Sequence, residues 1–299
     1  MTRRGLGVVV AVAALSLAIT QPAASAGKGA DAPEANRHVN LSALQSMLAE
    51  QIAKAACFAA LEVNATAQRR YMAGAYELFS LTHLGLRGGN SALGLAEEVH
   101  PNMLQALDAV ERESNGWRAR VTAAIHANGA LSDKQMLRIV EETETVLPAT
   151  NALAERASRT YGATAGESLA QSLRIKLASR QRLLSQKIAK DFCLIAQGHE
   201  VAHHRAELNA AIGLFDASMN ALIDGFAAFG LAAEANPTRR AELEAVRDAW
   251  NEIRPALAEV AAGAAPDAAS ISTVAWGNNV VLTLANAAVF SYETDETAS

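Results

Sequence analysis

The chain shows the hydrophobic pattern of amphipathic helices along most of its length. Between residues 173 and 196, four apolar side chains recur on one line of a helix with about 100° per residue: Leu177, Leu184, Ile188 and Ile195. The opposite side of this stretch is small or polar, with Ala178, Arg182, Ser185, Gln186, Ala189 and Cys193. This helix therefore has one face for its own core and one that a partner could approach closely.

The same stretch occurs twice. Residues 41–60 align without a gap on residues 177–196, an offset of 177 − 41 = 136 residues, and Cys57 then falls on Cys193. This regularity indicates an internal duplication. Further pairs follow at this offset or one less: Gly89 with Gly225, Pro101 with Pro237, Leu107 with Leu243, and Asn151 with Asn286.

Each half contains four helical segments separated by Gly, Asn and Pro. We expect helices near 38–63, 65–87, 98–127 and 132–160, and again near 167–198, 200–230, 238–263 and 268–292. Short connections between long helices give antiparallel neighbours, so we predict an all-α fold of two tandem antiparallel four-helix bundles, 38–161 and 162–299. Pro148 and Pro255 fall within the helical pattern and are expected to kink or end their helices.

Residues 1–26 have the pattern of a secretory signal peptide. Arg3 and Arg4 precede an apolar run, and Ala24-Ser25-Ala26 forms a cleavage motif. The run is shorter than the roughly 20 residues that span a bilayer, so we expect an exported, periplasmic protein without a transmembrane segment in the mature chain. Residues 27–37 are expected to form a linker.

Composition narrows the function further. The net charge of −5 and the lack of a basic arm argue against nucleic-acid binding. The sequence has no haem-attachment motif, Gly-rich phosphate loop or G-x-S-x-G motif, so we expect neither a cofactor nor an enzyme. The Ala-rich helix faces are compatible with a homodimer.

Residues 175–190, I-K-L-A-S-R-Q-R-L-L-S-Q-K-I-A-K, closely resemble the opening helix of one periplasmic input domain. That domain occurs at the N-terminus of type IV pili methyl-accepting chemotaxis transducers (PilJ-like) and, in related form, in NarX-like nitrate/nitrite sensor kinases. Residues 282–292, L-T-L-A-N-A-A-V-F-S-Y, resemble the closing helix. The resemblance implies two tandem copies of an all-α bundle that senses rather than catalyses.

The resemblance also implies a ligand site. In the nitrate-sensing branch, one arginine of this helix binds the anion at a two-fold axis, and Arg182 matches that arginine. The implied ligand is an oxyanion such as nitrate or nitrite, and the implied partner is a membrane sensor kinase or chemotaxis transducer. A planar guanidinium suits a planar oxyanion. The candidate ligand-binding residues are Arg182, Arg180, Ser185, Lys187 and Ser46, the counterpart of Arg182 in the first copy.

Two other interpretations stay open. Arg180, Arg182 and Lys187 could instead form a solvated basic face of a structural or adaptor protein. His199-Glu200-Val201-Ala202-His203 matches H-E-x-x-H, which on one helix would supply His199 and His203 as zinc ligands and Glu200 as general base. This pattern makes a zinc-dependent hydrolase an alternative, although the extended H-E-x-x-H-x-x-G-x-x-H form is absent.

The cysteines distinguish two arrangements of the halves. The relatives bring two copies of the motif helix together across an axis, and this chain could do so internally by pairing residues 38–63 with 167–198. Cys193 follows Arg182 by 11 residues, about three turns plus 20°, so both would face that axis. A Cys57–Cys193 disulfide would then form. The alternative is two separate buried thiols in bundles placed end to end.

Overall fold

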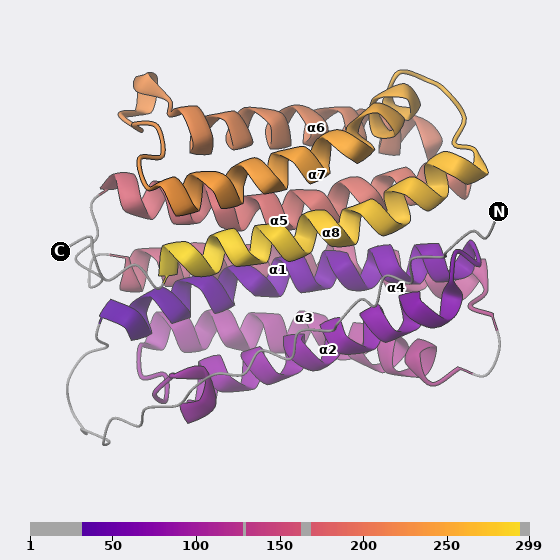
Figure 1. Cartoon of the computed structure of the whole chain (residues 1–299). Helices are drawn as coiled ribbons and strands as arrows, with labels where there is room; N and C mark the ends of the chain where they lie inside the picture. Colours follow the sequence, from indigo (N-terminus) through magenta and orange to yellow (C-terminus); the bar gives the residue numbers. More distant parts are fainter. Residues whose placement is uncertain (1–31, 128–129, 163–168, 294–299) are drawn as a thin grey trace, which may run out of the picture.

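The computed structural model describes residues 32–127, 130–162 and 169–293, which are almost entirely helical (Figure 1). No strand forms among these residues, so the predicted all-α fold is confirmed. The helices are α1 (Ala32–Ala60), α2 (Ala65–Gly88), α3 (Pro101–Ile125), α4 (Asp133–Tyr161), α5 (Leu169–Ala196), α6 (Val201–Asp224), α7 (Pro237–Ala261) and α8 (Ala268–Glu293). Two short 3-10 turns lie at Ser91–Leu93 and Ala227–Phe229.

Each half is a four-helix bundle with the same internal contacts. α1 packs against α2 and α4, and α3 packs against the same two helices; α5 through α8 repeat this arrangement. One hydrogen-bond pattern recurs at the offset of 136. The Gln45 amide donates to the Phe79 carbonyl oxygen and to Thr82, while Gln181 donates to the Phe215 carbonyl oxygen and to Ser218. The two halves therefore share a packing plan as well as a sequence pattern.

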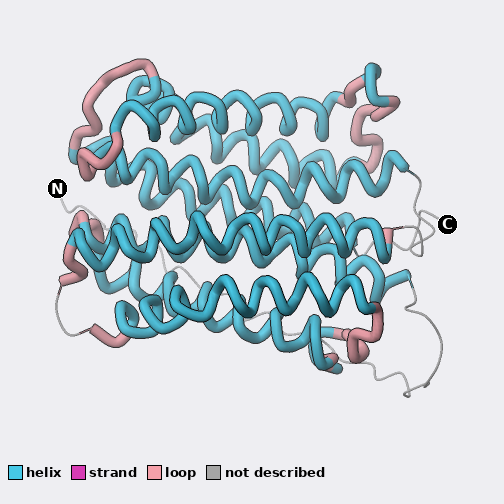
Figure 2. Tube along the Cα trace, turned by 180° about the vertical axis from the view of Figure 1, so that it is seen from behind, coloured by secondary structure: helices cyan, strands magenta, loops and turns pink. Residues whose placement is uncertain are grey.

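The two bundles lie side by side, joined mainly through α1 and α5 (Figures 1 and 2). Cys57 of α1 and Cys193 of α5 form a disulfide, with their Cα atoms 6.1 Å apart. Lys190 of α5 contacts Glu50 of α1, and Arg182 contacts Asn40, so residue numbers rise together along both helices. The helices therefore run parallel. Of the two arrangements that the sequence left open, the structure has the side-by-side one, not separate thiols in bundles placed end to end.

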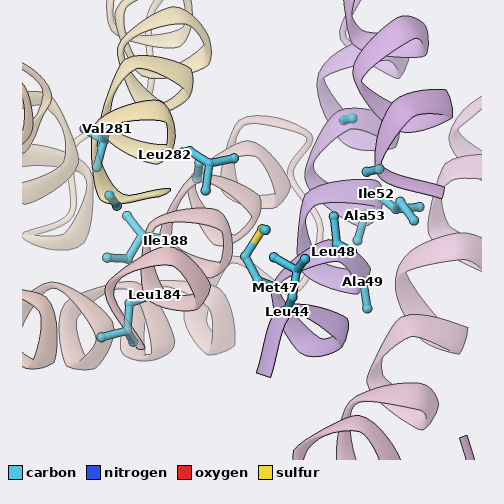
Figure 3. Close-up of a cluster of buried hydrophobic side chains, with 14 of the residues drawn as sticks. Leu44, Met47, Leu48, Ala49, Ile52, Ala53, Leu184, Ile188, Val281 and Leu282 are labelled. Carbon is cyan, nitrogen blue, oxygen red and sulfur yellow. The ribbon is translucent and has the colours of Figure 1, made fainter. Parts of the chain in front are cut away.

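We call this contact the seam. On α1 it involves residues 40, 47, 50, 54 and 57, on α5 residues 182, 190 and 193, and on α8 residues 278 and 279. Positions 47, 50, 54 and 57 alternate by three and four residues, as in a coiled-coil interface. Figure 3 shows Met47 pointing from α1 towards α5 and α8. The small or polar face of α5 thus has α1 of the same chain as its partner.

Several expected boundaries are wrong. α1 begins at Ala32, so part of the expected linker is helical; Glu34 accepts a hydrogen bond from the Ala96 backbone N–H at 2.6 Å, which holds this first turn against the segment before α3. α3 begins at Pro101 rather than 98. The expected helix 200–230 ends at Asp224, because Gly225 has a φ of +83° and the chain folds back in a Phe226–Leu231 bridge.

Two further sequence predictions concern the prolines inside helices and the N-terminal segment. Pro148 lies inside α4 and Pro255 inside α7, and neither ends its helix. The expected signal peptide lies outside the described residues, so its assignment stays a prediction. None of the described helices is both long enough and apolar enough to cross a membrane.

Candidate functional site

Arg182 lies where α1, α5 and α8 meet. Its side chain is charged, yet the residue is only 4% exposed. The guanidinium donates to Ser179 Oγ at 3.3 Å and to Asn286 Oδ1 at 3.5 Å, and it also donates to Asn40 Oδ1. Groups from both bundles thus surround a single cation.

The chemistry of these neighbours suits an anion. Ser179 and both asparagines can donate as well as accept hydrogen bonds, because a hydroxyl rotates and an amide can present its NH₂ group. Asn40 is half-buried and Asn286 is exposed, so the cluster reaches the protein surface. A small oxyanion could accept from the guanidinium and from the amide groups together. Burial strengthens such a charge-assisted pair because less water competes with it.

The two candidate serines do not hydrogen-bond to this guanidinium. Ser46 donates to Thr150 at 3.0 Å and to Asn151 Oδ1 at 2.8 Å, both in α4. Because Asn151 is the counterpart of Asn286, the first half has a neutral serine–asparagine contact where the second has an arginine. The Ser185 hydroxyl donates to the Arg182 backbone carbonyl oxygen at 2.8 Å. Ser185 therefore supports the local helix rather than the ligand cluster.

Arg180 and Lys187 lie away from the cluster. Arg180 is exposed. Lys187 forms ion pairs with Asp191 at 2.9 Å and with Glu207 of α6 at 3.0 Å. At about 100° per residue, positions 180 and 187 lie about 160° and 140° around the helix from 182, which explains the separation. The candidate cations therefore form neither one ligand site nor one basic face.

A buried ion pair lies in the seam, and the sequence pattern did not predict it. Lys190 is 1% exposed and Glu50 is 2% exposed, with Nζ and Oε2 2.9 Å apart. Glu144 of α4 also pairs with Lys190. Burial alone would lower the pKa of Lys190, but the carboxylates of Glu50, Asp191 and Glu144 raise it above its ordinary value. This ammonium therefore stays charged and links α5 to the first bundle.

Lys54, the counterpart of Lys190, crosses the seam in the other direction. Its ammonium donates to Asn278 Oδ1 and Asn279 Oδ1 of α8, both at 2.9 Å. Burial lowers the pKa of Lys54 to about 7. The sequence does mark both lysines as equivalent positions, because Lys54 aligns with Lys190 and each lies three residues before a cysteine. The duplication alone could not show which groups they would meet.

The expected H-E-x-x-H geometry is wrong. α6 begins at Val201, so His199 and Glu200 lie in the turn before it, while His203 is an exposed residue of α6. Gly198 and Glu200 both have positive φ values, which turns the chain between α5 and α6. His199 and His203 therefore do not share one helix face, and the arrangement that places Glu200 as a general base beside a two-histidine zinc site is not formed. The zinc-dependent hydrolase therefore loses the H-E-x-x-H arrangement on which that alternative was based.

The neighbouring Asp191 connects this turn to α5. Its carboxylate accepts from His204 Nδ1 at 2.9 Å and pairs with Lys187. Burial would raise the pKa of Asp191, but the hydrogen bond from His204 and the charges of Lys190 and Lys187 hold it below the usual value. Asp191 is therefore an ionised, buried hydrogen-bond acceptor.

This parallel helical arrangement, with the buried Arg182 where the bundles meet, defines a helical-bundle protein with a candidate ligand site. A family model described as "Type IV pili methyl-accepting chemotaxis transducer N-term" matches residues 163–274, which include α5, α6, α7 and the start of α8. The matched family is a signalling family, not an enzyme family, and the match supports a sensory or signalling role. Neither the curated proteins nor the solved structures contain a significant match to this chain.

Proposed function

We propose that this chain is a non-enzymatic, exported sensory protein. It binds a small oxyanion, such as nitrate or nitrite, at Arg182 and presents the bound state to a membrane sensor kinase or chemotaxis transducer. The observation that carries this proposal is the burial of the Arg182 guanidinium among Asn40, Ser179 and Asn286 at the seam. The signalling-family match over the same helix supports the sensory part.

The charge at this position supports one ligand per chain. Arg182 contributes one positive charge, and its counterpart Ser46 contributes none. A monovalent oxyanion would bind this guanidinium through charge-assisted hydrogen bonds. A second anion would have no equivalent cation at Ser46. The proposal therefore requires a stoichiometry of one anion per chain.

The disulfide supports a preformed site. Cys193 lies 11 residues beyond Arg182, about 16 Å along α5 at 1.5 Å per residue. The bond to Cys57 fixes α5 against α1 at that end of the seam. Less ordering is then needed when a ligand binds between the helices, and preorganisation of this kind favours affinity.

Calorimetric titration of the mature protein with nitrate and nitrite tests the proposal. We expect one binding event per chain, weakened by about 1.5–3 kcal/mol in Arg182→Ala, the range for hydrogen bonds to charged groups. Arg180→Ala is the matched control, because it removes an exposed arginine from the same helix and should leave affinity unchanged. The absence of binding heat with either anion, or equal losses in the two variants, would contradict the proposal.

A further inference from the structure

We propose that His199, Glu200 and His204 form a binding site for a first-row divalent metal ion, with Zn²⁺ as the best-suited ion, at the turn between α5 and α6. Each residue offers one ligand atom, and the three atoms lie within 4.8 Å of one another. This set differs from the H-E-x-x-H pair, because His204 replaces His203. It is independent of the anion site at Arg182.

The backbone of the turn brings these side chains together. α5 ends in a Schellman motif: the His199 N–H bonds to the Leu194 carbonyl oxygen and the Gly198 N–H to the Ile195 carbonyl oxygen, both at 2.9 Å. Gly198 has the left-handed φ of +73° that this motif requires. The chain then reverses through Glu200 into α6. His199 and Glu200 are thereby held beside the first turn of α6, which carries His204.

Asp191 prepares His204 as a ligand. His204 is 7% exposed, and its Nδ1 lies 2.9 Å from Asp191 Oδ1. When Nδ1–H donates to this carboxylate, Nε2 is the ring nitrogen left to bind a metal ion. A carboxylate that fixes the tautomer of a metal-binding histidine in this way is a common feature of protein metal sites. Asp191 is a positioning residue, and its second oxygen is held by Lys187 at 2.9 Å.

The turn between α1 and α2 is the counterpart of this turn in the first half, and it has none of the metal-related residues. At the positions of His199, Glu200 and His204 it has Val63, Asn64 and Gln68, and at the position of Asp191 it has Ala55. All four metal-related residues are therefore specific to the second half.

Glu200 in particular has no evident structural benefit. Asn64 and Glu200 both adopt left-handed φ values, +50° and +38°. Asn tolerates this conformation better than other non-glycine residues, and Asn64 also caps α2 by accepting from the Ala67 N–H. Glu200 makes no side-chain cap hydrogen bond to α6. A carboxylate at this strained position is explained by binding a cation.

The donor set indicates the class of ion. Two imidazole nitrogens and one carboxylate oxygen suit Zn²⁺ and related transition metals rather than Ca²⁺ or Mg²⁺, which prefer oxygen ligands. Zn²⁺ binds such donors at about 2.0–2.2 Å. The side chains of the exposed Glu200 and the half-buried His199 can rotate to bring their ligand atoms to these distances from a shared ion. His204 is held in place by Asp191. Three protein ligands leave one tetrahedral position for water.

Zn²⁺ titration of the chelator-treated mature protein tests this site, with calorimetry for affinity and Co²⁺ absorption for coordination geometry. We expect one ion per chain. His199→Val, Glu200→Asn and His204→Gln each copy the first half, so they should preserve the fold while weakening binding; the triple variant should abolish it. Asp191→Asn should weaken affinity roughly 10- to 100-fold, as for other residues that orient a metal-bound histidine. It should also alter the Co²⁺ spectrum.

His203→Ala is the matched control, because His203 is exposed and adjacent to His204 but outside the proposed set. It should leave affinity and the Co²⁺ spectrum unchanged. The proposal is overturned if the triple variant still binds one Zn²⁺ per chain, if His203→Ala weakens binding as much as His204→Gln, or if the wild-type protein binds no stoichiometric metal. Nitrate titration of the triple variant separates this outcome from the anion site, which these substitutions should not affect.

Discussion

Lys54 and Lys190 occupy equivalent positions in the two halves, yet their electrostatic settings are opposite. Lys190 faces the carboxylates of Glu50 and Glu144, whereas Lys54 faces the amide oxygens of two asparagines. A buried charge is costly unless an opposite charge compensates it. The two lysines should therefore contribute to stability with opposite sign.

We predict that Lys54→Met stabilises the protein near neutral pH. The pKa of Lys54 is about 7 in the folded state and about 10.5 in the unfolded state, so the unfolded chain holds the extra proton between these values. Wild-type stability should consequently rise with pH across this window, and the advantage of Lys54→Met should shrink by up to about 1.4 kcal/mol per pH unit. Urea unfolding of both proteins at pH 7, 8 and 9 measures this difference.

Lys190→Met should do the reverse. Removing this ammonium leaves the Glu50 carboxyl buried without its partner, which typically costs about 3–5 kcal/mol for a buried ion pair. The same urea experiment at pH 7 provides the measurement. A change of stability in the same direction for both methionine variants would contradict the opposite contributions of the two lysines.

The residue-level site was only partly predictable from sequence. Helical periodicity placed Arg182 on the face of α5 that accepts a partner, and the structure has α1 on that face. The contact with Asn40 spans 142 residues and depends on how the bundles dock, which periodicity within one helix does not encode. The same limit hid the contacts of Lys54 and Lys190 across the seam.

At the scale of elements, the helices were predictable but the segments joining α2 to α3 and α6 to α7 were not. The pattern predicted a helix over 200–230, because residues after 224 remain mostly apolar. Gly225 instead takes a φ of +83°, and the chain passes so close that a Cβ on Gly225 would lie 2.6 Å from the Ala233 backbone nitrogen. This approach is set by tertiary folding, and Gly89 shows the same crowding in the first half.

This geometry predicts that Gly225→Ala destabilises the second bundle more than Gly230→Ala. Both glycines have positive φ, so each alanine should incur roughly 1–2 kcal/mol of backbone strain. Only position 225 adds contact with backbone atoms, since a Cβ at Gly230 meets nothing within 4 Å. Thermal unfolding followed by circular dichroism should show the larger loss for Gly225→Ala. Equal losses would mean that the segment after α6 can shift to relieve the contact.

At the scale of the whole molecule, the duplication predicted two bundles but left their placement open. Small and polar residues on α5 suit a close helix partner, and nothing in one helix says whether that partner comes from the same chain or another. The structure supplies α1, and it closes the seam with a disulfide between equivalent positions. The packing of two equivalent helices, which two chains could provide, is thus provided by α1 and α5 of one chain.

The disulfide should stabilise the protein substantially. It joins residues 136 positions apart, and closing a loop of this size restricts the unfolded chain. We expect the Cys57→Ala/Cys193→Ala double variant to lose about 2–5 kcal/mol of unfolding free energy, the usual cost of removing a native disulfide. Urea unfolding of the oxidised wild type and of the variant, both without reductant, gives the comparison. An unchanged midpoint would show that the bond adds little to the packed seam.

The seam itself should hold the halves together without the disulfide. Lys190 and Glu50 are each no more than 2% exposed and pair with each other across the seam, so separating the halves would break this buried ion pair. A specific protease site placed between Gly162 and Leu169 would allow the chain to be cut between α4 and α5. After cleavage and reduction, we expect both halves to coelute in size-exclusion chromatography at micromolar concentration. Adding Lys190→Met to the cleaved, reduced protein should promote their separation, because it leaves Glu50 buried at the interface without its cation. Separation of the unsubstituted halves on reduction alone would instead assign their association to the covalent bond.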